Sequence, residues 1–102
     1  MTAREIEIDF SNAMGKANEL DEIAGQLSDV GGDLDEALQM LSVNWQGDSA
    51  TQYIAKGMEL KEQMQSTVKN LNDIAEAIRV SARRIQMAEK RALELAQQRI
   101  NN

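Results

Sequence analysis

Apolar side chains recur along the first half of the chain at the three- and four-residue spacing of an amphipathic helix. Two rows make up this stripe: Phe10, Ala17, Ala24, Gly31, Leu38 and Trp45 in one, and Ala13, Leu20, Leu27, Leu34 and Leu41 in the other. The alternating spacing places both rows on one face of an α-helix. Ile23, Val30 and Ala37 widen that face. A face this wide is typical of a helix that contacts more than one neighbour.

The limits of this helix are less regular than its middle. Ile6, Ile8 and Phe10 alternate like a strand, and Asp9 or Ser11 could cap a helix, so we expect the helix to run from about residue 9 to 43. Gly31–Gly32 costs a helix roughly 1 kcal/mol per residue relative to alanine. A turn there would shift the apolar rows, and they continue without a slip. The pattern therefore favours a continuous helix through the glycine pair.

A turn is predicted at residues 44–48, where Asn44, Gly47 and Asp48 follow one another closely. Gly47 suits the left-handed conformation that ends a helix. Ser49 to Gln52 has the pattern of a capping box that opens the next helix. Trp45, the single tryptophan of the chain, stands beside this turn.

The second half fits one further helix, from about residue 49 to 98. One row holds Gly57, Met64, Leu71, Ile78, Ile85 and Ala92, and another holds Leu60, Ile74, Ala88 and Leu95. A flanking row of Ile54, Val68, Ala75, Ala82 and Ala96 stands beside them. The positions that we expect to pack helix on helix are Leu20, Leu27, Leu34, Leu38, Leu41, Leu60, Met64, Leu71 and Ile78.

The predicted fold is therefore all-α, a single domain in which two antiparallel helices form a hairpin joined by a Trp-x-Gly turn. A hairpin covers only one side of each helix, and both helices have wide apolar faces. A second hairpin would close a four-helix bundle. We expect a dimer, with either a second copy of this chain or another helical hairpin as the partner.

The composition narrows the chemistry. His and Cys are absent, so the commonest metal ligands and proton shuttles are missing. The seventeen carboxylates follow helical spacing and are interpreted as solvated helix faces. We expect no cofactor, no metal, no catalysis and no bound small molecule, since two helices form little concavity. The net charge of −6 argues against nucleic acid as a partner.

Export is the open question of localisation. The first ten residues have no basic flank followed by an apolar run, so they do not resemble a cleavable signal peptide. Apolar runs long enough to span a membrane are also missing. The chain is expected in the cytosol unless it leaves by a route that does not read such a signal.

Trp45-Gln46-Gly47, at the mid-chain turn of a hundred-residue chain with two helices, resembles the WXG family of ESAT-6-like (Esx) proteins. Ala50 and Tyr53 extend the likeness. The resemblance implies a hairpin that dimerises antiparallel and is exported through the membrane ATPase of type VII secretion. It also implies an export signal shared between the turn, at Trp45 and Gly47, and a late Tyr-x-x-x-Asp/Glu motif of the partner.

The late motif departs from that pattern. Glu89 stands in the acidic place, but Ile85 replaces the aromatic residue. The chain could therefore depend on a partner for this half of the signal, as an adaptor for an LXG toxin with a WXG-like helical domain would. The rival hypothesis from another class is a cytosolic coiled-coil scaffold or regulator in which the Trp-x-Gly sequence is accidental.

Overall fold

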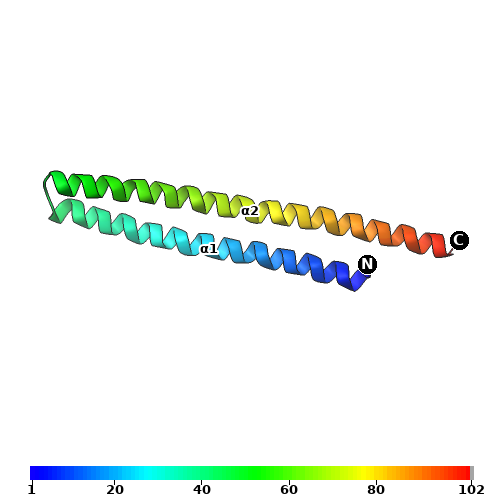
Figure 1. The fold of residues 1–102 in the computed structure, drawn as a ribbon. Coiled ribbons are helices and arrows are strands. Elements are labelled where there is room, and N and C mark those ends of the chain that lie inside the picture. The colour runs from blue at the N-terminus through cyan, green and yellow to red at the C-terminus, as the bar shows by residue number, and fades with distance from the viewer. Residues whose placement is uncertain (102) are drawn as a thin grey trace. The chain divides into compact units, whose positions relative to one another are not determined.

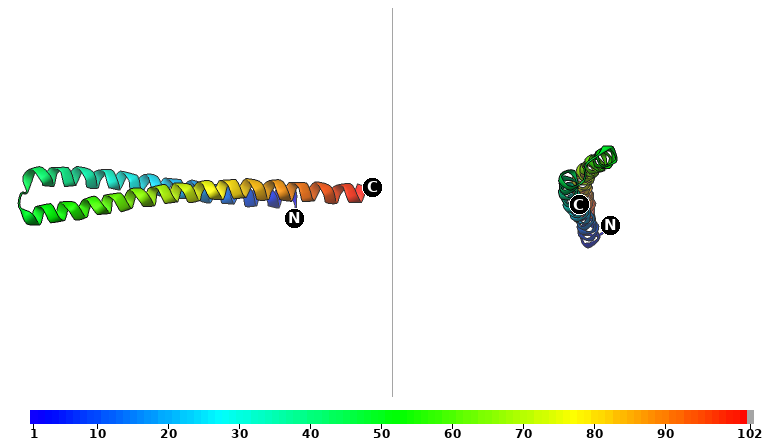
Figure 2. Two further views of the ribbon diagram at one scale, coloured as in Figure 1. Left: turned by 90° about the horizontal axis from the view of Figure 1, so that it is seen from above. Right: turned by 90° about the vertical axis from the view of Figure 1, so that its left-hand side faces the viewer.

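Two long α-helices make up the chain: α1 (Ala3–Asn44) and α2 (Asp48–Asn101), joined by a turn at residues 45–47. The structure, a computed structural model, describes residues 1–101. Within that range it contains no strand. Figures 1 and 2 show each helix continuing without a break from the turn to its far end. The predicted all-α helical hairpin is confirmed.

The first helix starts earlier than predicted, at Ala3 rather than near residue 9. The Thr2 hydroxyl accepts a hydrogen bond of 3.1 Å from the backbone N–H of Glu5, which caps the first turn. Ile6 is 1% exposed and extends the predicted row of Ala13 and Leu20 by one heptad. The alternation of Ile6, Ile8 and Phe10 was misleading, because Ile6 and Phe10 are one helical turn apart and share a face.

The glycine pair does not interrupt α1, as predicted. Gly31 is buried where α1 packs on α2, and a Cβ there would meet the Met64 side chain at 3.9 Å. Gly32, one residue on, is exposed. Position 31 therefore lies in the contact between the helices, where a Cβ would make an ordinary van der Waals contact with α2.

Two compact units divide the chain, and each contains part of both helices. The turn unit is Asp21–Asn72, which includes the turn itself. The terminal unit combines Met1–Leu20 with the part of α2 from Asp73 onward. Within each unit, α1 and α2 pack side by side and run in opposite directions.

In the turn unit, α2 turns the predicted row of Gly57, Met64 and Leu71 towards α1, together with the flanking row of Ile54 and Val68. The inward positions are Ala50, Ile54, Gly57, Lys61, Met64, Val68 and Leu71, all buried or half-buried. The predicted row containing Leu60 lies outside this contact, and Leu60 is 50% exposed. The reason is that α1 covers the side of α2 that carries Ile54, Lys61 and Val68, so the flanking row of the apolar pattern, and not the row of Leu60, completes the contact.

In the terminal unit, the inward positions of α2 are Ala75, Ile78, Ala82, Gln86, Glu89 and Leu93. Opposite them, Ile6 and Ala17 of α1 are buried. The Lys90 ammonium lies 2.8 Å from the Glu7 carboxylate, which fixes the pairing of the two helices here. Because α1 begins at Ala3, α2 continues beyond it, and its positions 94–100 are all exposed (Figure 1).

Candidate functional site

The turn between the helices is the first candidate site. The backbone N–H of Trp45 donates to the Leu41 carbonyl at 2.9 Å, so Trp45 continues the last turn of α1. Gly47 then adopts a φ of 119°, which side chains of other residues disfavour. The chain reverses direction at this residue, directly before α2.

The start of α2 differs in detail from the predicted capping box. The Gly47 carbonyl accepts hydrogen bonds from both the backbone N–H and the hydroxyl of Thr51, each at 3.1 Å. The helix therefore begins at Asp48, and Ser49 lies inside its first turn rather than in front of it. Asp48 places a carboxylate at the positive end of the helix dipole, which favours this start.

Trp45 and Tyr53 form an aromatic pair beside the turn. Their ring centroids are 5.6 Å apart and the planes are inclined by 30°. Trp45 is 39% exposed and Tyr53 is 64% exposed, whereas Ala50, between them in sequence, is 2% exposed. Ala50 thus anchors the first turn of α2 against α1, and the two rings are left accessible. The turn residues were predicted from the sequence, but the contact between the two rings was not.

Ile85 and Glu89 in the terminal unit are the second candidate site. Ile85 is 56% exposed, while Glu89 is half-buried and faces α1. The positions of α2 that face α1 here are Ala82, Gln86 and Glu89, and Ile85 lies outside this face. A straight helix of 3.6 residues per turn drifts in this way from a seven-residue repeat. Ile85 and Glu89 both line a small cleft of about 140 Å³ between α1 and α2.

The charges around Glu89 are organised by Glu7 of α1. Lys90 donates to Glu7, and Gln86 donates to the same carboxylate at 3.3 Å. The hydrogen bond and the charge of Lys90 hold the pKa of the Glu7 carboxyl below its ordinary value, and the weaker bond from Gln86 adds to this effect. The cation nearest to Glu89 in sequence is therefore already paired with another acid.

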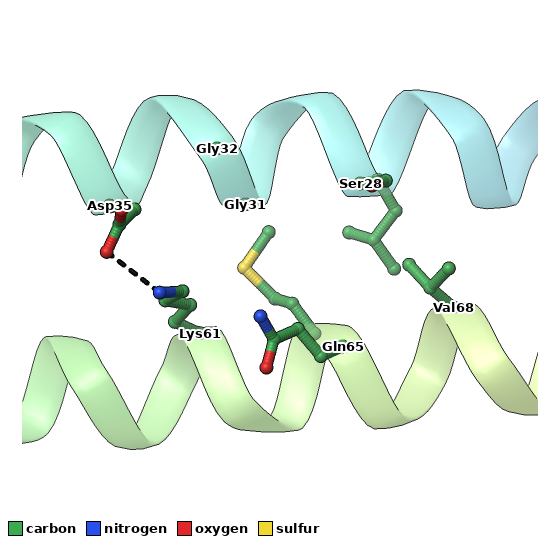
Figure 3. Close-up of a pocket in the computed structure, with 9 residues that line it drawn as sticks. Ser28, Gly31, Gly32, Asp35, Lys61, Gln65 and Val68 are labelled. Carbon is green, nitrogen blue, oxygen red and sulfur yellow. Dashed lines mark hydrogen bonds and ion pairs between the residues drawn. The ribbon is translucent and has the colours of Figure 1, made fainter.

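A groove of about 330 Å³ opens between the helices of the turn unit, where Gly31 and Gly32 supply no side chain. Figure 3 shows the glycine pair on α1, with Gln65 of α2 across from it. The Lys61 ammonium reaches the Asp35 carboxylate at 2.8 Å along this groove. Within the described chain, no group of three or more potential ligands could hold a metal ion.

The predicted helix-packing positions fall into two groups. Leu38 is buried, and Leu20, Leu27, Leu34, Leu41, Met64, Leu71 and Ile78 are half-buried in the contact between α1 and α2. Leu60 lies outside that contact. Further apolar side chains about half exposed are Ile23, Val30 and Leu60 in the turn unit, and Ile8, Ile74 and Ile85 in the terminal unit. In the described chain, no helix is long and apolar enough to cross a membrane.

The family model for proteins of about 100 residues with a Trp-x-Gly motif, WXG100, matches residues 5–90. The chain belongs to the WXG100 family. Neither a curated protein nor a solved structure matches the chain significantly. As a WXG100 protein, it is a small helical protein associated with type VII secretion. Proteins of the WXG100 family typically pair with other WXG proteins, and they are not known as enzymes.

Proposed function

We propose that this chain is a substrate of type VII secretion that works by binding another helical protein and carries out no catalysis. The observation that carries the proposal is the WXG100 match over residues 5–90, with Trp45 and Gly47 at the single turn of the hairpin. On this proposal the chain is one WXG-type domain, located in the cytoplasm before export and outside the cell afterwards.

The export signal is proposed to consist of Trp45 and Gly47 at the turn and of Ile85 and Glu89 late in α2. The accessible rings at the turn support this assignment, because a recognition surface must be exposed. The exposure of Ile85 supports it in the same way. The receptor on this proposal is the membrane ATPase of the secretion system.

Dimer formation is proposed to cover the apolar side chains that the hairpin leaves exposed, among them Ile23, Val30 and Leu60. The distribution of charge favours an antiparallel arrangement of two copies, in which the turn unit of one lies against the terminal unit of the other. The turn unit carries nine acidic and three basic side chains, whereas the terminal unit carries eight of each. Two turn units in contact would repel each other, and a turn unit against a terminal unit would not.

A second candidate is favoured by Ile85. Since this residue replaces the aromatic member of the late motif, the missing aromatic group would come from a partner. The chain would then be an adaptor that pairs with the helical domain of an LXG-type toxin. The mass of the purified protein, alone and co-expressed with a neighbouring toxin gene, separates a homodimer from such a complex.

The test of export compares culture supernatants from a type VII-competent host with those of a strain that lacks the secretion ATPase. The chain should appear outside the first strain and stay inside the second. A cytosolic marker protein controls for lysis. Equal amounts outside both strains would overturn the proposal.

A further inference from the structure

Gly57 marks the closest approach of the two helices that the glycines reveal. A Cβ built on Gly57 would overlap Cδ2 of Leu38, and it would lie 3.0 Å from Cδ1 and 3.2 Å from Cγ of that side chain. Ordinary contact between carbon atoms needs about 3.5–4.0 Å. By contrast, Cβ atoms at Gly25 or Gly32 would meet nothing within 4 Å. Among the helical glycines, Gly57 is thus the one at which a neighbouring side chain occupies the space that a Cβ would need.

Leu38 has little freedom to give way. It is 8% exposed and is the only leucine among the buried residues of the described chain. The three atoms that would lie nearest to a Cβ at position 57 belong to the end of this side chain, so relieving the overlap requires that end to rotate within its packed surroundings. Added bulk at Gly57 must therefore displace the Leu38 side chain from its packed position or increase the separation of the helices.

The contact between Leu38 and Gly57 lies one to two helical turns away from the aromatic pair of Trp45 and Tyr53. Tyr53 precedes Gly57 by four residues, one turn of α2, and Leu38 precedes Trp45 by seven residues, two turns of α1. Both helices are continuous between these positions. A change in helix separation at Leu38 and Gly57 is therefore carried along α1 and α2 to the two rings.

The rings have little else to hold them. Trp45 and Tyr53 are both exposed, so the surrounding side chains enclose neither of them. Their 5.6 Å separation depends on where the two helices place the backbones that carry the rings. The geometry of the turn surface then depends on how closely α1 and α2 approach one another next to it.

We propose that Gly57 is a positioning residue for the turn: by admitting Leu38 against the backbone of α2, it holds Trp45 and Tyr53 in the arrangement read during export. The inference rests on the proposed function, in which the turn is part of the export signal. Its structural half, the control of ring geometry by Gly57, is tested separately from export.

The experiment compares Gly57→Ala with the matched control Gly25→Ala, which makes the same substitution in a helix of the same unit where space is open. The chain has one Trp, one Tyr and one Phe, and Phe does not absorb at the long-wavelength end of the near-ultraviolet range, so the circular dichroism there reports on Trp45 and Tyr53. Tyr53→Ala supplies the spectrum of Trp45 without the neighbouring ring. Gly57→Ala should shift toward that spectrum and lose export, while Gly25→Ala should change neither.

Rescue distinguishes positioning from a general loss of stability. Leu38→Ala removes the three atoms that would lie nearest to a Cβ at position 57. In the Leu38→Ala background, adding Gly57→Ala should therefore leave the aromatic spectrum and export unchanged from Leu38→Ala alone. Far-ultraviolet circular dichroism follows the helical content of each variant.

Several results would overturn the inference. An unchanged aromatic spectrum in Gly57→Ala would show that Leu38 absorbs the added carbon. A changed spectrum with normal export, where Trp45→Ala abolishes export, would show that ring geometry is not read. Loss of all helical signal in Gly57→Ala would assign the glycine to folding instead. Normal export of Trp45→Ala would instead refute the export role of the turn, which belongs to the proposed function.

Discussion

The Lys61 ammonium lies 2.8 Å from the Asp35 carboxylate, in the contact between α1 and α2 (Figure 3). The two side chains are only 24% and 30% exposed, and Gln39 donates a second hydrogen bond to Asp35 at 3.0 Å. A slip of α1 by one heptad would bring Ser28 or Ser42 opposite Lys61, and neither can neutralise it. The ion pair therefore favours one pairing register of the helices in the turn unit.

Removing one charge of this pair should destabilise the hairpin. Asp35→Asn is expected to lower the free energy of unfolding by about 1–2 kcal/mol, between the values for exposed and buried pairs, because it leaves a half-buried ammonium without its counter-ion. Urea denaturation followed by circular dichroism measures the change. Asp33→Asn, two residues away on an exposed position, is the control and should have little effect. Equal midpoints for the two variants would contradict a role for the pair.

The Glu7 carboxyl should give the terminal unit a dependence on pH. Its pKa is lowered from 4.5 by the hydrogen bond and charge of Lys90. Since the folded chain binds this proton less well than the unfolded chain, the stabilisation is present above pH 4.5 and is lost as the pH falls through the lower folded value. Wild type should therefore melt above Glu7→Gln at neutral pH, and the two melting temperatures should converge once the pH falls below the lowered pKa of Glu7. A constant difference across this range would refute the assignment.

Substitutions at Trp45 and at Leu27 should distinguish a surface residue of the export signal from a residue of the helix contact. Because Trp45 is 39% exposed, Trp45→Ala should cost less than the roughly 3–5 kcal/mol of a core tryptophan, while it abolishes export. Leu27→Asp places an unpaired charge in the helix contact and should remove the cooperative unfolding transition. Thermal melts beside the export assay measure both properties. If Trp45→Ala melts as early as Leu27→Asp, the tryptophan belongs to the core and not to the signal.

The glycine pair in α1 should be a source of added stability. Gly32→Ala meets nothing within 4 Å, so it should stabilise the chain by about 1 kcal/mol through helix propensity alone. Gly31→Ala makes an ordinary contact with Met64 and should behave similarly. Melting temperatures test both variants. A loss of stability in Gly32→Ala would contradict the open space found around this position.

Ile85→Tyr tests the late motif. Ile85 is 56% exposed, so the larger ring should fit with little change in melting temperature. If Glu89 is the acidic half of the export signal, the new tyrosine should allow export without a partner. The assay compares secretion of the variant and of the wild type when each is expressed alone. Restored export that persists in Ile85→Tyr/Glu89→Gln would exclude Glu89 from the signal.

The hairpin and its turn could be predicted from the sequence because the repeat from Leu20 to Leu41 is regular and Gly47 interrupts it. The side of α2 that α1 covers could not be predicted, because an apolar pattern shows which positions avoid water but not which neighbour covers them. Leu60, predicted in the contact with α1, is therefore exposed, and Ile54, predicted at its flank, lies in the contact. Of the candidate site, Trp45 and Gly47 were evident as residue types. The contact of Trp45 with Tyr53 depends on distances that appear only in the folded chain.

The part of α2 that continues past the start of α1 has a consequence for amide hydrogen exchange. Its residues 94–100 are helical and all exposed, and a helical segment this short is marginal without packing. Amides there should exchange almost as fast as in a free peptide, whereas those around Ala82 should be protected. The position along α2 at which protection disappears would report, in solution, where α1 begins.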